Sequence, residues 1–169
     1  MALVTEDGTA KADAESYASL ADADAYFTGR GNATWAALST EAKEQALRKA
    51  TDYMGQVYRM RWAGYRKTDT QALDWPRYAV PKPDFYAYYA YYGEDDVPAE
   101  VVRACCELAV RASASDLAPD VGRRKLREKV DVIEVEYDPS AAAYTTYRAI
   151  DALLAPLLTA GGSARVVRA

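Results

Sequence analysis

The segment from Pro98 to Ser115, PAEVVRACCELAVRASAS, constrains the fold of this chain most strongly. Pro98 suits the first turn of a helix because its missing N–H is not needed there, and Glu100 complements the positive helix start. Apolar residues then recur at the helical spacings of three and four: Val101, Cys105, Leu108, Ala109 and Ala112. Further apolar residues widen this stripe until only a narrow charged ridge remains, which is typical of a helix buried on several sides. We therefore predict that helix 98–115 is the central helix of the fold.

Length, composition and charge limit the number of domains and the functions that are compatible with this sequence. The chain has 169 residues, half of them hydrophobic, which suits one domain with a substantial core. Its formal net charge of -4 argues against a general nucleic-acid binder, because such proteins normally carry a basic excess. The sequence has no histidine, which removes the commonest general base and every histidine metal ligand. Since it also contains no catalytic, phosphate-binding or metal-ligand motif, we predict a non-enzymatic protein without cofactor or metal.

The two cysteines, Cys105 and Cys106, are adjacent in the predicted central helix. Neighbouring helical side chains point about 100° apart, which is poor geometry for a mutual disulfide. We interpret them as small buried apolar side chains in a reducing compartment, with a redox or metal role as the alternative. The sequence also lacks a long apolar run and a signal-peptide pattern, which predicts a soluble protein made in the cytoplasm, with no membrane partner.

Two further helices are predicted from capping residues. Ser19 is expected to cap a helix with Asp22 at its third position, in a partial capping box. Ser39 is expected to cap the longest amphipathic helix of the chain, from Thr40 to about Met60. The resulting fold class is mainly α, a bundle of about four to five helices around the central helix.

A small β element completes the predicted fold. The Asp7-Gly8 pair predicts the turn of an N-terminal hairpin over about residues 2–17. The segment 130–137, VDVIEVEY, carries the best strand signal, although its alternation changes phase at Val132–Ile133. We interpret this change of phase as a bulge or bend within one strand.

The C-terminal part is expected to hold a last helix that opens at Ser140 or Ala141 and ends or kinks at Pro156. The predicted organisation is a single α-rich domain over residues 1–160 and a flexible tail over 161–169. The tail offers apolar and basic candidate contacts for a partner: Arg165, Val166, Val167 and Arg168.

Three groups of residues stand out within this framework. The expected core anchors are Trp35, Trp75, Val101, Cys105 and Leu108. A basic cluster, Arg59, Arg61, Arg66 and Lys67, is interleaved with Trp62 and Tyr65; it could grip single-stranded nucleic acid, or its long side chains could simply cover aromatic surface. The loop from Phe85 to Tyr92 is crowded with tyrosines, which are favoured at protein interfaces. Its candidate partner contacts are Tyr86, Tyr88, Tyr89, Tyr91 and Tyr92, with a self-packed loop as the alternative.

An ordered set of segments resembles a known family. The segments are EDGTAKADAESYASLADADAYFTGRG, ATWAALSTEAKEQALRKATDYM, ALDWPRYAV, VPAEVVRACCELAVRA and EKVDVIEVEYDP. Together they resemble the tailed-phage head–tail connector adaptors, a group often labelled DnaT-like single-stranded DNA-binding protein. The Tyr-rich loop, and Asp131 where a glycine would suit a bend, depart from that pattern.

The resemblance implies a structural virion protein in the neck, between the capsid portal and the tail. Its implied partners are the portal protein, a tail, tail-terminator or tail-tube protein, and further copies in a ring, dodecameric to match the portal. Packaged double-stranded DNA would pass through the channel without tight binding. The alternative is a single-stranded DNA-binding replication protein that uses the basic clusters Arg59–Lys67 and Arg123–Lys129 with their aromatics.

Overall fold

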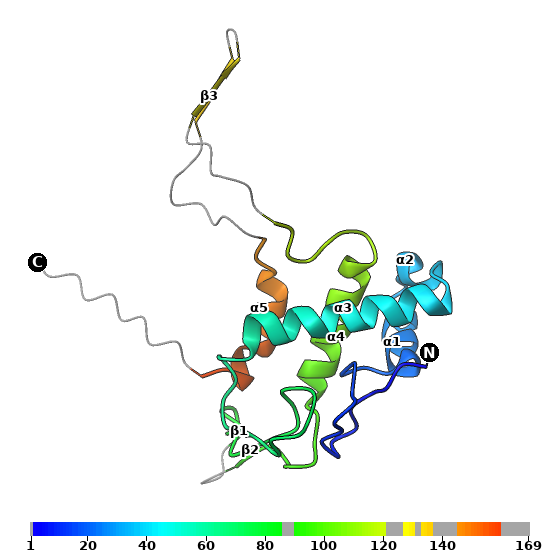
Figure 1. The fold of residues 1–169 in the computed structure, drawn as a ribbon, viewed down its shortest axis with the longest axis vertical. Coiled ribbons are helices and arrows are strands. Elements are labelled where there is room, and N and C mark those ends of the chain that lie inside the picture. Colours follow the sequence, from blue (N-terminus) through cyan, green and yellow to red (C-terminus); the bar gives the residue numbers. More distant parts are fainter. Residues whose placement is uncertain (1, 86–89, 121–126, 131–132, 137–144, 160–169) are drawn as a thin grey trace, which may run out of the picture.

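The computed structural model describes residues 2–85, 90–120, 127–130, 133–136 and 145–159 (Figure 1). Its helices are α1 (Leu20–Thr28), α2 (Ala33–Ala36), α3 (Thr40–Tyr58), α4 (Ala99–Ala112) and α5 (Arg148–Leu154), followed by a 3-10 turn, η1 (Ala155–Leu157). Its strands are β1 (Tyr65–Arg66), β2 (Arg77–Tyr78), β3 (Arg127–Val130) and β4 (Ile133–Glu136). The predicted fold class, mainly α with a small β element, is confirmed.

The core forms where α3 crosses α4, which is the most extensive contact between elements in the described chain (Figure 1). One face of α4 is fully buried, including Val101, Cys105 and Leu108. Helix α5 packs against the same helix, and α1 contacts both α3 and α4. The prediction of a central helix is therefore confirmed, although α4 ends at Ala112 and its C-cap is Ser113 rather than Ser115.

The predicted helix starts are confirmed by their caps. The Ser19 hydroxyl accepts the backbone N–H of Asp22 at 3.0 Å, and the Asp22 carboxylate accepts the Ser19 N–H at 3.3 Å. The Ser39 hydroxyl accepts the Ala42 N–H at 3.2 Å. Each serine thus satisfies a backbone donor that has no partner within the first helical turn.

The expected N-terminal hairpin over about residues 2–17 does not form. The only ladder contact in this region is an isolated parallel bridge between Thr5 and Ser16. The buried Glu6 carboxylate instead accepts the backbone N–H groups of Gly8, Ala10 and Lys11 at 2.9–3.0 Å. Because one carboxylate satisfies the donors of this turn, the chain closes into a loop without pairing two strands.

The expected single strand over 130–137 is also corrected. Strands β3 and β4 form an antiparallel hairpin in which Val130 stands opposite Ile133 and Arg127 stands opposite Glu136. The change of phase in the sequence therefore marks a chain reversal, not a bulge within one strand. The residues between the two strands, 131–132, lie outside the described part of the chain.

The last helix begins later than predicted. Helix α5 starts at Arg148, while Ser140 and Ala141 lie outside the described residues. Tyr147, just before the helix, packs edge-on against the Tyr53 ring at 5.5 Å and donates its hydroxyl to the Leu117 carbonyl at 3.2 Å. These contacts fix the entry to α5. The predicted end near Pro156 is confirmed, because η1 replaces the helix from Ala155.

A set of extended segments packs beside the end of α3. The Ala63 N–H donates to the Leu157 carbonyl at 2.9 Å, and Trp62 bridges Leu158 in antiparallel fashion. Strand β1 follows directly and pairs with β2, with Tyr65 opposite Tyr78. The end of the described chain therefore lies beside the β1–β2 ladder.

Candidate nucleic-acid interface

The five residues expected to be core anchors all lie in the core: Trp35, Trp75, Val101, Cys105 and Leu108. The Trp35 indole donates its Nε1–H to Asp24 at 2.7 Å, and its ring lies 4.9 Å from that of Phe27. The Trp75 ring meets the Trp62 ring edge-on at 5.8 Å. These residues form the hydrophobic core, so a binding site has to lie among the surface residues.

The Tyr-rich loop lies partly within the described residues. Its two arms pair, since the Lys82 N–H donates to the Ala90 carbonyl at 2.8 Å and the Tyr92 N–H donates to the Val80 carbonyl at 2.9 Å. Tyr91 is 47% exposed, whereas Tyr92 is half-buried and faces the Trp75 ring. Burial raises the pKa of the Tyr92 phenol. The other candidate contacts lie outside the described residues: Tyr86, Tyr88, Tyr89, Arg165, Val166, Val167 and Arg168.

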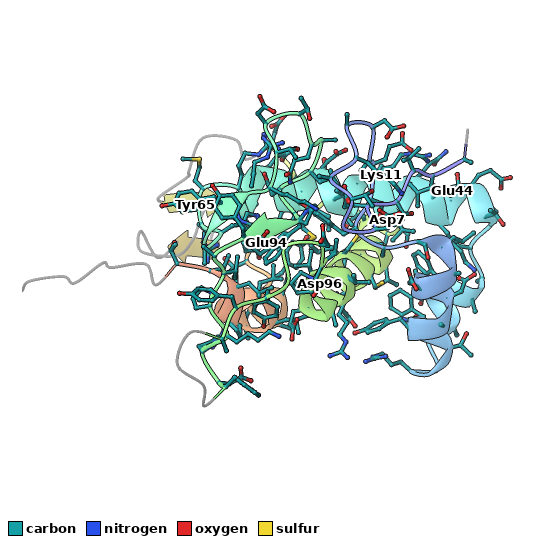
Figure 2. The ribbon with its side chains drawn as sticks, turned by 90° about the horizontal axis from the view of Figure 1, so that it is seen from below. Asp7, Lys11, Glu44, Tyr65, Glu94 and Asp96 are labelled. Atoms are coloured by element: carbon teal, nitrogen blue, oxygen red, sulfur yellow. The ribbon has the colours of Figure 1, made fainter. Side chains whose placement is uncertain are left out.

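The most exposed pair of stacked aromatics in the described chain is Tyr65 and Tyr78. Their ring centroids are 5.5 Å apart and their planes differ by 30°, while the two residues are 65% and 41% exposed. Figure 2 shows Tyr65 toward one side of the molecule, away from Asp7 and Lys11. Such a pair presents flat apolar faces to solvent on a short, paired piece of backbone.

Close contact between backbone segments fixes this pair. Gly64, directly before Tyr65, has a φ of +65°, and a Cβ there would lie 2.2 Å from the Tyr78 carbonyl oxygen. Only glycine adopts this conformation without strain at so close an approach. Gly64 thus allows the close approach of the two tyrosine-bearing strands.

The buried side chain of Arg77 also stabilises the β1–β2 ladder. It is 6% exposed, and its Nε and Nη2 donate to the carbonyls of Ala63 and Gly64 at 2.8 Å each. Its Nη1 donates to the Asp74 carbonyl at 3.1 Å. Burial lowers the pKa of the Arg77 guanidinium. The planar guanidinium of this side chain therefore ties residues 63–64 and Asp74 to strand β2.

The cations of the predicted basic cluster differ in their availability to a ligand. The Arg59 Nε donates to the Asp74 carboxylate at 3.0 Å, and the Asp74 side chain is only 1% exposed. Lys67 is ion-paired with Asp95. Withdrawing Arg59 would leave a buried charge without compensation, so this arginine has a structural role.

Two other cations, Arg61 and Lys82, are held less closely by carboxylates. The Arg61 guanidinium side chain is 48% exposed and lies 3.6 Å from the Asp151 carboxylate, too far for a strong hydrogen bond. Lys82 is exposed, with its Nζ 5.1 Å from the centroid of the Tyr92 ring. Arg61 precedes Tyr65 by four residues and Lys82 follows Tyr78 by four, so both cations flank the pair in the sequence.

The sequence placed Trp62 in the aromatic cluster, but its side chain is 4% exposed and packs on Tyr58 and Trp75. The partner that the sequence reasoning missed is Tyr78, thirteen residues after Tyr65. A glycine before one tyrosine and the Pro76-Arg77 pair before the other are weak signals for a ladder. Neither signal predicts which residues pair.

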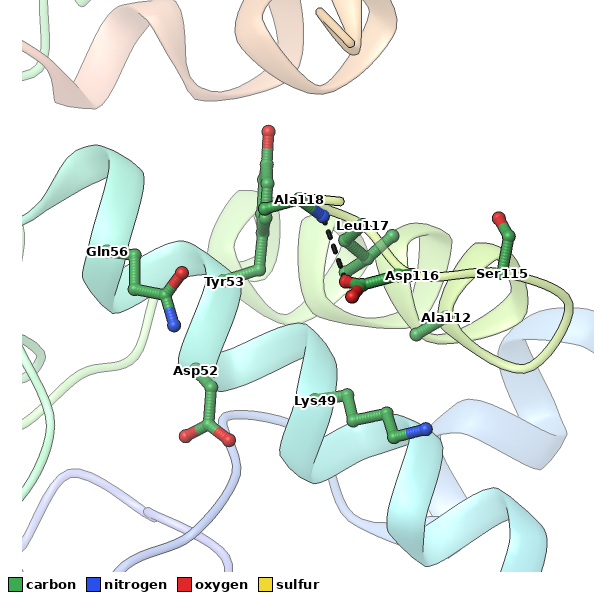
Figure 3. Close-up of a pocket in the computed structure, with 9 residues that line it drawn as sticks. All are labelled: Lys49, Asp52, Tyr53, Gln56, Ala112, Ser115, Asp116, Leu117 and Ala118. Atoms are coloured by element: carbon green, nitrogen blue, oxygen red, sulfur yellow. Dashed lines mark hydrogen bonds between the residues drawn. The ribbon is translucent and has the colours of Figure 1, made fainter. Parts of the chain in front are cut away.

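The other surface features of the described chain are weaker candidates for a binding site. A cavity of about 290 Å³ lies between α3 and the loop after α4, lined among others by Lys49, Asp52 and Asp116 (Figure 3). The Asp116 carboxylate already accepts the Ala118 N–H at 3.1 Å, and the charges of the lining have mixed sign. Within the described ranges, no cluster of three or more metal-ligating side chains occurs. None of the helices described here combines the length and apolar character needed to cross a membrane.

The cysteines are free and buried, as predicted for small apolar side chains. The Cys105 Sγ lies 3.4 Å from the Thr51 hydroxyl, and burial raises the pKa of the thiol. Burial likewise raises the pKa of the Cys106 thiol. Both thiols are therefore held in the unreactive protonated form.

A family model described as DnaT-like ssDNA binding protein matches residues 1–169. The chain belongs to this family. No curated protein and no solved structure matches the chain at a significant level.

The family match corrects the main functional prediction. The expected structural role in the virion, as a head–tail connector in the neck, is wrong, because the family that spans the whole chain is one of DnaT-like ssDNA binding proteins. The alternative that the sequence left open, single-stranded DNA binding, fits this family. The connector partners, the portal and tail proteins and a dodecameric ring around double-stranded DNA, remain untested predictions.

Proposed function

We propose that this chain binds single-stranded DNA by stacking unpaired bases on the Tyr65–Tyr78 pair. The observation that carries the proposal is the exposed stack itself, with ring centroids 5.5 Å apart on a rigid two-stranded ladder. Every base has a flat π face, so an aromatic platform binds single strands with little regard for sequence. Membership of a DnaT-like ssDNA binding family supports the same function.

The geometry favours stacking on the outside of the pair. The rings already face one another, so a base cannot enter between them without separating the strands that Gly64 holds together. Each ring keeps exposed area, more on Tyr65 than on Tyr78. Arg61 and Lys82 are proposed to contact the phosphates on either side.

Few phosphate contacts are consistent with the acidic composition. Arg59 and Lys67 are engaged by carboxylates, and the net charge of the chain is -4. With about two phosphate contacts, the logarithm of the affinity should fall with the logarithm of the salt concentration with a slope of only about -1.4. Binding should thus depend mainly on stacking, and double-stranded DNA, whose bases are already stacked, should compete poorly.

The test is a fluorescence anisotropy titration of a labelled oligothymidylate with the full chain. Replacing Tyr65 by Ala should weaken binding by about five- to 150-fold, the range for loss of one base–aromatic stack. Tyr78→Ala should act in the same direction, and Tyr65→Phe should retain most of the affinity because it keeps the ring.

Met60→Ala is the matched control, since it removes a side chain that is 92% exposed and lies just before the platform but carries no ring. It should bind like the wild-type chain. Absence of binding by the wild-type chain would overturn the proposed function. Binding that survives both tyrosine substitutions would place the interface elsewhere.

A further inference from the structure

Asp74 is a buried carboxylate with only one of its two oxygens hydrogen-bonded. Its side chain is 1% exposed, and its Oδ1 accepts the Arg59 Nε–H at 3.0 Å. Its Oδ2 is also buried and has no hydrogen-bond partner among the described residues. A buried carboxylate oxygen that accepts no hydrogen bond is costly, because it has lost its water. A further N–H donor at this oxygen would therefore be stabilising.

The backbone of Asp74 is fixed by hydrogen bonds. Its N–H donates to the Tyr17 hydroxyl at 2.9 Å, and its carbonyl accepts the Arg77 Nη1–H at 3.1 Å. The next residue, Trp75, is fully buried in the core. The carboxylate cannot turn outward to water without breaking these contacts, so a donor has to come to it.

An open cavity of about 480 Å³ lies beside Asp74, where α3 meets residues 72–74. The charged side chains of its lining are two carboxylates, Asp52 and Asp74, and one cation, Arg59, so their charges sum to -1. Leu73 adds apolar surface to the wall. The volume suits a small molecule or a single side chain, and the charge favours a cation.

The Arg59 side chain is the part of this lining that can move. It is 55% exposed and follows the last residue of α3, so its rotation uncovers Asp74 without disturbing the core. A guanidinium can bind both oxygens of a carboxylate, but Arg59 bonds only Oδ1. Its positive charge disfavours a divalent metal ion beside it. A monovalent cation with several N–H donors fits the remaining oxygen better.

From these observations we infer that the cavity binds an organic cation with N–H donors, an alkylguanidinium or alkylammonium group, through Asp74. The N–H groups of the ligand donate to Oδ2, the exposed Asp52 adds attraction, and the alkyl part packs against Leu73. A free small amine or an arginine or lysine side chain of a partner protein carries such a group. This inference does not rest on DNA binding.

The test is isothermal titration calorimetry of the full chain with two probes, ethylguanidinium and the blocked tripeptide acetyl-Gly-Arg-Gly-amide. Ethylguanidinium should bind with a Kd of about 1 mM or tighter. Tetramethylammonium, a cation without N–H donors, should bind about tenfold more weakly or worse. Tighter binding of the tripeptide would identify a protein side chain as the ligand, and tighter binding of ethylguanidinium would identify a free amine.

Two surface variants test the position of the site. Asp52→Asn should weaken ethylguanidinium binding by about two- to fivefold, because it removes one carboxylate of the lining. The matched control Glu41→Gln neutralises an exposed carboxylate at the start of the same helix and should leave binding unchanged. Equal binding by these two variants would contradict the inference.

Arg59→Ala tests the role of Asp74 through stability. This variant should melt below the wild-type chain, and ethylguanidinium should raise its melting temperature more than that of the wild type, because both oxygens of Asp74 then accept from the ligand. At ten times the measured Kd, the increase should be about 3–6 °C. No saturable binding of either probe, equal binding of tetramethylammonium and ethylguanidinium, or no stabilisation of Arg59→Ala would each overturn the inference.

Discussion

The two small ladders in the described part of the chain are both two-stranded and antiparallel, but different contacts stabilise them. In β1–β2 each strand has only two residues, and the ladder is held by Gly64 and by the buried fork of Arg77. In β3–β4 each strand has four residues, and the extensive contact that this ladder makes within the described residues is the pairing of its own two strands. The first ladder is therefore a rigid platform built by the core. The second ladder, as far as the described residues show, depends on the pairing of its own two strands.

Arginine side chains contribute differently to the stability of the two ladders. Arg77 is 6% exposed and donates to three backbone carbonyls, whereas Arg127 belongs to β3, which pairs with β4 within the described residues. Removing Arg77 leaves those carbonyls without their donor, which is costly in a buried site. Substitutions of these two arginines therefore separate a ladder made by tertiary contacts from one made by local pairing.

The largest effect is expected for Arg77→Ala. Loss of its buried hydrogen bonds should lower the free energy of unfolding by about 3–5 kcal/mol, and the melting temperature by roughly 10 °C. Differential scanning calorimetry measures both quantities. The matched control Arg127→Ala should melt within about 2 °C of the wild-type chain. Equal melting temperatures for the two variants would remove the distinction between the ladders.

A smaller effect is expected for Gly64→Ala. Gly64 and Gly31 have nearly the same φ, +65° and +64°, but a Cβ at Gly31 has nothing within 4 Å, whereas one at Gly64 meets the Tyr78 carbonyl. Gly31→Ala should cost about 1 kcal/mol from the backbone conformation alone, and Gly64→Ala about 2–4 kcal/mol. Urea denaturation of both variants isolates the contribution of close approach. Equal losses would show that the β1–β2 ladder absorbs the added methyl group.

The smallest effect is expected from alkaline pH. Burial and the hydrogen bond from the Tyr58 hydroxyl to Asp151, 2.9 Å long, raise the pKa of that phenol above its ordinary value of 10.0. The folded state therefore favours the protonated phenol, so its contribution to stability is complete below pH 10 and is lost as the pH rises toward the folded-state pKa.

The Tyr58 ring also contacts the Trp62 ring, just before β1. The melting temperature should fall more steeply above about pH 10 in the wild-type chain than in Tyr58→Phe, which has no phenol to titrate. A thermal denaturation series at several pH values gives both slopes. Identical slopes would show that Tyr58 does not contribute to the pH dependence.

Much of the helical fold was predictable because its signals are local. Ser19 and Ser39 cap helices through bonds to N–H groups only three residues away, and the apolar period of α4 is visible within its own segment. Residues near the N-terminus were harder to interpret. The Asp7-Gly8 pair predicts a turn correctly, but it does not reveal that Glu6 would satisfy the N–H groups of that turn.

The candidate interface needed tertiary structure. Tyr65 was recognised as part of an aromatic and basic cluster, but its partner Tyr78 comes from the far side of a loop. The predicted cluster also included Trp62, whose burial depends on contacts with Tyr58 and Trp75. Local sequence patterns show which residues are aromatic or charged, but they do not show which side chains are exposed to solvent.

The sequence by itself therefore determined the central core helix α4 and the capped starts of α1 and α3, because each depends on spacings of a few residues, whereas it placed the start of α5 too early. Tertiary structure decided which arginines are buried and which tyrosines stack in solvent. The physical reason lies in desolvation. Arg77 is buried only because carbonyls distant in the sequence replace its water, and no pattern within the segment around it encodes that replacement.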